Sequence, residues 1–150
     1  MIKVKVSGIQ AVISGLDDYS NEIQKEVANE IQDWAKRTVA DAQRDVPFKT
    51  GDLKSTIRDV VGADRLTWIV KVGGINGVNY APYVVFGTGS MVDQSFLQQF
   101  GLVQYASQFR GKGIREVNLP MRDFLYRNAR TEFEKTFQNI KKILENNRNL

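Results

Sequence analysis

A long apolar stripe that ends at a proline is the feature that most constrains this chain. Between residues 17 and 45, apolar side chains recur every three or four residues, which is the spacing of one face of an α-helix. The positions on this stripe are Ile23, Val27, Ile31, Trp34, Thr38, Ala42 and Val46. Pro47 disfavours helical backbone in the residue before it, so we expect the helix to end there. The stripe is expected to lie in the core.

A second long helix is predicted near the other end of the chain. Pro120 can open it, and its apolar stripe consists of Leu125, Ala129, Phe133, Phe137, Ile140 and Leu144. Three segments read as strands: residues 2–6, and the pair 56–61 and 66–72, which a turn at 62–65 joins. This order predicts an α+β fold in which long N-terminal and C-terminal helices pack on one face of a small antiparallel sheet.

The central part of the sequence is less regular. Residues 80–86 are predicted to form a short helix, which Pro82 opens and the glycines of 87–90 end. From residue 91 to 119 no helical or strand period is present, so we expect residues 90–119 to form an extended loop or arm between this helix and the last one. The 150 residues fit a single domain spanning 1–150.

The composition excludes most catalytic classes. The chain has no Cys and no His, which removes disulfides, thiolate metal sites, Ser-His-Asp and Cys-His catalysis. The carboxylate pairs Glu22/Glu26 and Asp41/Asp45 stand among basic residues, and we expect them to face water. We therefore expect neither an enzyme nor a protein with a cofactor or metal site.

The net positive charge is compatible with an anionic partner. Lys and Arg number 21 and Asp and Glu number 17, giving a net charge of +4 and an isoelectric point near 9.4. A basic segment contains Arg110, Lys112 and Arg115 beside aromatic residues, a mixture found in nucleic-acid and protein interfaces alike. No apolar run reaches the length of a membrane span, so we expect a soluble protein made in the cytoplasm, with no membrane partner.

Three sequence blocks attract attention beyond their local structure. In the first, Pro47 is followed by Thr50-Gly51-Asp52-Leu53-Lys54-Ser55-Thr56-Ile57, in which Thr50 can cap a helical turn, Gly51 allows a tight approach, and Leu53 and Ile57 enter the core. The second block is Tyr80-Ala81-Pro82-Tyr83-Val84-Val85-Phe86-Gly87-Thr88. The third begins Arg122-Asp123-Phe124-Leu125 and extends to Ala129.

Together, and in this order, the blocks resemble the small neck or tail-completion proteins of long-tailed bacteriophages. The resemblance covers most of the chain. It rests on Pro47, Thr50, Gly51, Leu53, Ile57, Tyr80, Ala81, Tyr83, Phe86, Gly87, Thr88, Phe124 and Leu125. Two departures stand out: Val85 occupies a position that is often Glu in the family, and the stretch after Ser90 is longer than in compact members.

The resemblance implies a structural protein of the virion, located at the head–tail junction and made in the cytoplasm of the bacterial host. Members form rings, here expected to be hexameric, that contact neighbouring connector, tail-tube or terminator proteins. DNA passes through the lumen without sequence-specific binding. A tail-terminator ring that caps the tail tube is the alternative within the virion. A small basic nucleic-acid-binding domain is the alternative from another class.

Large aromatic and basic side chains are the candidates for the assembly interface, because such residues are enriched where proteins meet. The candidates are Tyr80, Tyr83, Phe86, Phe96, Phe100, Tyr105, Phe109, Arg110, Lys112 and Arg115. Tyr80, Tyr83 and Phe86 have an equally good alternative role, which is to pack the short helix against the sheet.

Overall fold

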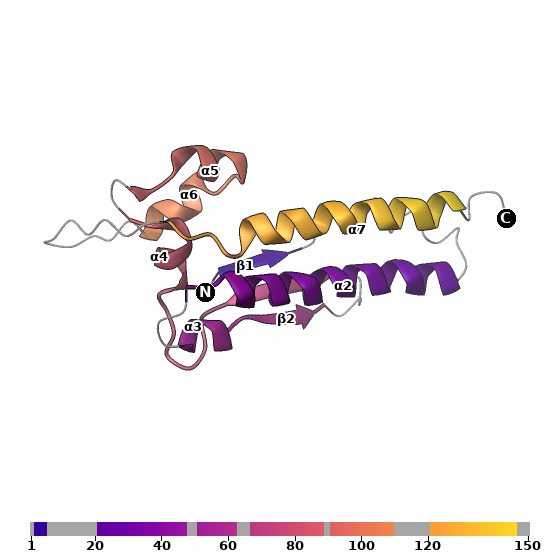
Figure 1. The fold of residues 1–150 in the computed structure, drawn as a ribbon, viewed down its shortest axis with the longest axis horizontal. Coiled ribbons are helices and arrows are strands. Elements are labelled where there is room, and N and C mark those ends of the chain that lie inside the picture. Colours follow the sequence, from indigo (N-terminus) through magenta and orange to yellow (C-terminus); the bar gives the residue numbers. More distant parts are fainter. Residues whose placement is uncertain are drawn as a thin grey trace, which may run out of the picture.

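The computed structural model describes residues 2–5, 21–47, 51–62, 67–88, 91–109 and 121–146. Two long helices lie side by side next to a small sheet, and short helices gather at one end (Figure 1). The elements are β1 (Ile2–Lys5), α2 (Asn21–Asp45), α3 (Asp52–Ser55), β2 (Arg58–Val61), β3 (Trp68–Val72), α4 (Ala81–Phe86), α5 (Gln94–Gln99), α6 (Val103–Ala106), η2 (Ser107–Phe109) and α7 (Tyr126–Asn146). This arrangement confirms the predicted α+β class, with long helices near both ends of the chain.

The sheet is antiparallel, with β3 between β1 and β2. Ile2 pairs with Val72, and these two side chains together with Val70 are fully buried. Because directly paired residues share a face, the opposite face carries Lys3 and Lys71. Trp68, Val70 and Val72 alternate along β3 and therefore share one face, and α2 packs against this face.

The two long helices run antiparallel. Contacts pair Asp45 with Asn128, Arg37 with Glu132, and Glu30 with Asn139, so positions descend along α2 as they rise along α7. At the centre of the seam, Trp34 is fully buried, and its indole Nε1–H donates a hydrogen bond of 2.9 Å to the carbonyl oxygen of Ala129. Trp34 thus joins apolar burial to a hydrogen bond between helices.

The last helix begins six residues later than Pro120 suggested, at Tyr126. Asp123 sets this start, because its carboxylate accepts hydrogen bonds from the backbone N–H groups of Leu125, Tyr126 and Arg127 at 2.8–3.0 Å. These donors have no partner within the helix, and an acidic side chain is also favoured by the helix dipole. Pro120 lies outside the described residues.

The prediction of an extended arm over residues 90–119 was wrong for the part that is described. Residues 94–109 form α5, α6 and η2, a compact group that packs beside α4 (Figure 1). Each helix is too short to show a period in the sequence, which is why the segment looked irregular. Asp93 caps α5 by accepting a hydrogen bond from the Phe96 N–H. Residues 110–120 lie outside the described part.

The predicted apolar stripe of the last helix was wrong at its centre. Phe137 is 50% exposed, whereas Glu132 and Thr136 are buried against α2. Arg37 is the reason, because its guanidinium donates to both the Glu132 carboxylate and the Thr136 hydroxyl, each at 2.7 Å. A polar partner on the facing helix therefore rotates the buried face of α7 away from Phe137, while Phe133 stays half-buried against the core.

Other boundaries differ by a few residues. The first strand of the hairpin begins at Arg58, because Thr56 and Ile57 still belong to the turn after α3. The second strand begins at Trp68. Predicted residues 6, 17–20 and 66 fall outside the described ranges.

The two tryptophans provide a matched test of the seam. Trp34 Nε1–H is bonded, whereas Trp68 Nε1–H is buried with no hydrogen-bond partner among the described residues. We predict that Trp34→Phe lowers the free energy of unfolding by about 2–3 kcal/mol, and that Trp68→Phe lowers it by about 1 kcal/mol or less. Chemical denaturation of both variants measures the difference. Equal losses would contradict a special role for the Trp34 bond.

Candidate assembly surface

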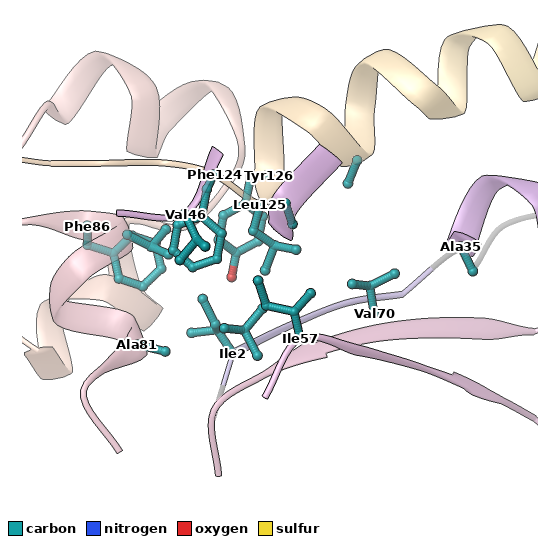
Figure 2. Packing of buried hydrophobic residues seen from close by; sticks show 14 of the residues in the cluster. Ile2, Ala35, Val46, Ile57, Val70, Ala81, Phe86, Phe124, Leu125 and Tyr126 are labelled. Carbon is teal, nitrogen blue, oxygen red and sulfur yellow. The ribbon is translucent and has the colours of Figure 1, made fainter. Parts of the chain in front are cut away.

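The three motif blocks meet in one buried cluster where α2 ends and α7 begins. Ile57 from the first block, Ala81 and Phe86 from the second, and Phe124 and Leu125 from the third lie close together in Figure 2. All five are at most 4% exposed. The blocks are far apart in the sequence, so their shared position makes them one structural unit.

The first block forms a tight turn into the sheet. Leu53 and Ile57 are buried as predicted, and Pro47 is the second residue after the end of α2. The reason given for Gly51 was wrong: no heavy atom lies within 4 Å of a Cβ at this position, and the requirement is its positive φ of 74°. Thr50, the expected cap, lies outside the described residues.

Thr56 is a residue of this block that sequence reasoning left without a role. Its side chain is fully buried and donates to the Leu53 carbonyl oxygen at 2.7 Å. The same hydroxyl accepts from the backbone N–H of Gly73 at 2.8 Å. Thr56 therefore connects α3 to the end of β3. Gly73 lies 17 residues away in the sequence, so the sequence itself gave no signal for this bond.

The second block, residues 80–88, packs closely against the end of β3, next to this turn. A Cβ at Gly73 would lie 3.2 Å from the Ala81 Cβ, so both positions require small residues. Gly87 has a φ of 71° and donates its N–H to the Tyr83 carbonyl oxygen, which ends α4. Thr88 is 2% exposed and Val85 is fully buried. A glutamate in place of Val85 would have to lie in the core.

Seven rings form an aromatic cluster over α4, α5, α6, η2 and the start of α7, which we call the aromatic head. Phe86 lies at its centre, with ring centroids 5.9 Å from both Tyr105 and Tyr126. The other members are Tyr83, Phe96, Phe100 and Phe109. Such edge-on and stacked ring pairs add to the stabilisation from buried area. Burial also raises the pKa of the Tyr126 hydroxyl.

Several interface candidates therefore belong to the core of the subunit. Phe86 and Phe96 are 1% and 2% exposed, so their assignment to a surface was wrong. They are buried because the segment after α4 folds back onto it as short helices. Tyr83, Phe100, Tyr105 and Phe109 are half-buried within the same cluster. The guanidinium groups of Arg127 and Arg130 cover the rings of Phe96 and Phe100, at 4.9 and 5.4 Å from their centroids.

Tyr80 is the candidate that the structure leaves on the surface. It is 42% exposed immediately before α4, and its backbone carbonyl oxygen accepts from the N–H groups of Tyr83 and Val84. Other exposed apolar side chains near this end include Ile75, Met91 and Val103. Arg110, Lys112 and Arg115 lie outside the described residues.

A polar group lies in the seam between α2 and α7. Glu132 is 5% exposed and accepts from Arg37 Nε at 2.7 Å and from Lys135 Nζ at 3.4 Å. Burial and a hydrogen bond with Glu132 raise the pKa of Asp41. Burial opposes ionisation of Glu132 too, but hydrogen bonds from Asp41, Arg37 and Lys135 lower its pKa. The pKa values of the two neighbouring carboxyl groups are therefore shifted in opposite directions.

The seam continues at Asp45, at the end of α2. Its two carboxylate oxygens accept from Arg44 at 2.8 and 2.9 Å, and Asn128 on α7 donates at 2.9 Å. The hydrogen bonds from Arg44 and Asn128 lower the pKa of Asp45 to about 2. Asp45 is exposed, as expected, although Asn128 of α7 also contacts it, whereas Asp41 is half-buried.

The remaining chemistry of the described residues is sparse. Within these ranges no group of three or more acidic side chains is placed to hold a metal ion. A groove of about 550 Å³ beside α2 and the hairpin is lined by Lys25, Ala28, Asn29, Gln32, Val61 and Trp68. No described helix has both the length and the apolar character needed to cross a membrane.

Comparison with known proteins gives no relative: no protein-family model, curated protein sequence or solved structure matches this chain.

Stability separates the two roles that the aromatic residues were given. We predict that Phe86→Ala lowers the free energy of unfolding by about 3–5 kcal/mol, because it empties the centre of the aromatic head. Tyr80→Ser should change it by less than about 0.5 kcal/mol, because the ring is largely solvated. Thermal and urea denaturation measure both. A large loss for Tyr80→Ser would show that this ring also belongs to the core.

The Asp45 contacts predict a loss of stability in acid. The folded-state pKa of about 2 lies below the ordinary value of 3.8, so ionised Asp45 stabilises the fold above about pH 4. This contribution disappears as the pH falls from about 4 to 2. Asp45→Asn should flatten that part of the stability profile, whereas the exposed control Glu145→Gln should not. An unchanged profile for Asp45→Asn would refute the assignment.

Proposed function

We propose that this chain is a structural subunit of the head–tail connector of a long-tailed bacteriophage. In this role, copies form a ring, with six subunits favoured, that joins the tail to the DNA-filled head and lets DNA pass. Its partners are neighbouring connector proteins and the tail-tube or terminator protein. The role is one of assembly, without catalysis or a cofactor.

The observation that carries the proposal is the meeting of the three motif blocks in one buried cluster (Figure 2). Here Ile57, Ala81, Phe86, Phe124 and Leu125 touch the same core region, and Gly51 and Gly87 have the positive φ values that explain glycine at these places. The motifs therefore describe a common structural element, as expected for a resemblance between folds.

A second line of support is the division of the second block between core and surface. Ala81, Val85 and Phe86 pack inward, whereas Tyr80 remains 42% exposed. An exposed tyrosine on a rigid base suits an interface, because its large ring loses little conformational entropy on binding. Tyr80 is the residue of the block that we assign to contacts with a neighbouring protein of the particle.

The test is electron microscopy of lysates from a phage that carries an early stop codon in this gene. We expect filled heads beside unattached tails of regular length. Complementation with Tyr80→Ser, which leaves the fold stable, should restore joining less well than complementation with the native chain. Complementation with Lys141→Gln, an exposed change on α7, is the matched control and should restore it fully.

Other outcomes separate the alternatives. Tails of abnormal length would favour the terminator role, because a tube without its cap continues to polymerise. Intact, infectious particles would overturn any role at the junction. The nucleic-acid alternative would then come forward, and salt-dependent binding of the purified chain to DNA would test it.

A further inference from the structure

Three cations form a row across the outer face of the sheet. Lys3 on β1 pairs directly with Lys71 on β3, and Lys71 pairs directly with Arg58 on β2. Directly paired residues lie on the same face, and this face is opposite to the one that buries Val70 and Val72 against α2. We call Lys3, Lys71 and Arg58 the cationic row. Like charges directly opposite each other destabilise a sheet, so the row is unfavourable in the isolated subunit.

The two lysines of the row have no compensation within the described chain. No described carboxylate lies within ion-pair distance of Lys3 or Lys71, although Lys36, Arg37, Arg44, Arg130 and Lys135 each have one. Arg58 Nη1 donates to the carbonyl oxygens of Thr56 and Gly73, at 2.8 and 3.0 Å. These two hydrogen bonds hold the guanidinium at the end of the row.

A complementary stripe lies on the first half of α2. Glu22, Glu26 and Asp33 are exposed on one face of the helix, at spacings of four and seven residues. None of the three has an ion pair within the described residues. The basic residues of the same face, Lys36 and Arg44, lie further along the helix and are paired with Asp59 and with Asp41 and Asp45. We call Glu22, Glu26 and Asp33 the acidic stripe.

Part of the acidic stripe matches the length of the cationic row. Two strand spacings place the ends of the row roughly 10 Å apart. Seven residues of helix separate Glu26 from Asp33 by roughly 10 Å, and Glu22 lies roughly 6 Å further along the helix. The row lies on the outer face of the sheet, and α2 covers the inner face, so the two surfaces cannot meet within one subunit. Different patches on different sides are what a head-to-tail contact between copies requires.

We infer that the cationic row of one copy binds the acidic stripe of the next copy. This inference rests on the proposed ring and identifies its subunit contact. A second copy is a better occupant than DNA, because this chain carries a stripe with as many charges as the row. Three cations over about 10 Å would provide few phosphate contacts, and non-specific DNA affinity grows with their number.

The test is a charge swap in the purified full-length chain, measured by sedimentation velocity in low salt. Lys3→Glu/Lys71→Glu and Glu26→Lys/Asp33→Lys should each weaken self-association at least roughly tenfold. An equimolar mixture of the two variants should restore it, because each reversed surface then faces a complementary one. Lys141→Gln/Lys142→Gln, which changes two exposed α7 lysines, should associate like the native chain.

Further measurements keep the test independent of folding. Thermal melting should show that Lys3→Glu/Lys71→Glu leaves the subunit folded, since one like-charge pair is exchanged for another and the pair between position 71 and Arg58 becomes one of opposite charge. If the reversed variant fails to fold, Lys3→Thr/Lys71→Thr provides the same loss of association. Rising salt should weaken association of the native chain, because exposed charge pairs are screened.

Several results would overturn the inference. These are a native chain that stays monomeric in low salt, variants that associate normally, or a mixture that does not recover. Loss of DNA binding with unchanged self-association in Lys3→Glu/Lys71→Glu would assign the row to DNA. The proposed function can fail separately. If the mixed variants recover self-association but the phage with the early stop codon still makes normal particles, the head–tail role is refuted and this contact stands.

Discussion

The seam between α2 and α7 is the interaction on which the rest of the structure depends. Trp34 fills it and donates to the Ala129 carbonyl oxygen, while Arg37 joins the buried Glu132 and Thr136 from the other helix. Glu132 could not be buried without the hydrogen bonds from Arg37 and Lys135, because an unpaired carboxylate in the core costs much free energy. The seam fixes the rotation of α7, which in turn places Phe124, Leu125 and Tyr126 under the short helices. The position of the aromatic head therefore depends on the alignment of the two long helices.

The sequence predicted those features that have a clear local cause. Pro47 ends α2, alternation in residues 68–72 gives the faces of β3, and the order of elements gives the α+β class. It failed where the cause is a residue distant in sequence. Phe137 fits a helical stripe as well as Thr136 does, and only Arg37 on the other helix decides between them. The short helices of residues 94–109 escaped notice because their stability comes from rings packed against α4 and α7, and their own periodicity is brief.

The candidate site also combines residues that local sequence patterns identify with residues that only the tertiary structure brings together. Motif residues such as Ile57 and Phe86 lie in the core, and Tyr80 remains as the exposed member. The cationic row was invisible in the sequence, because Lys3, Arg58 and Lys71 become neighbours only through strand register. Asp123 could have been recognised, since an acidic residue just before a helical stripe is an ordinary helix start. The helix start at Asp123 depends on local chemistry that can be recognised in the sequence. The cationic row depends on pairing between distant segments, which cannot.

We propose that this chain acts by joining to copies of itself, head to tail. The chain has no cysteine, so a pair introduced at Lys71→Cys and Glu26→Cys would be the sole source of disulfides. The measurement is non-reducing electrophoresis of the double variant after mild oxidation. The account predicts a ladder of linked species from the double variant and monomers from each single variant. Monomers alone from the double variant, or dimers from a single variant through a symmetric contact, would contradict it.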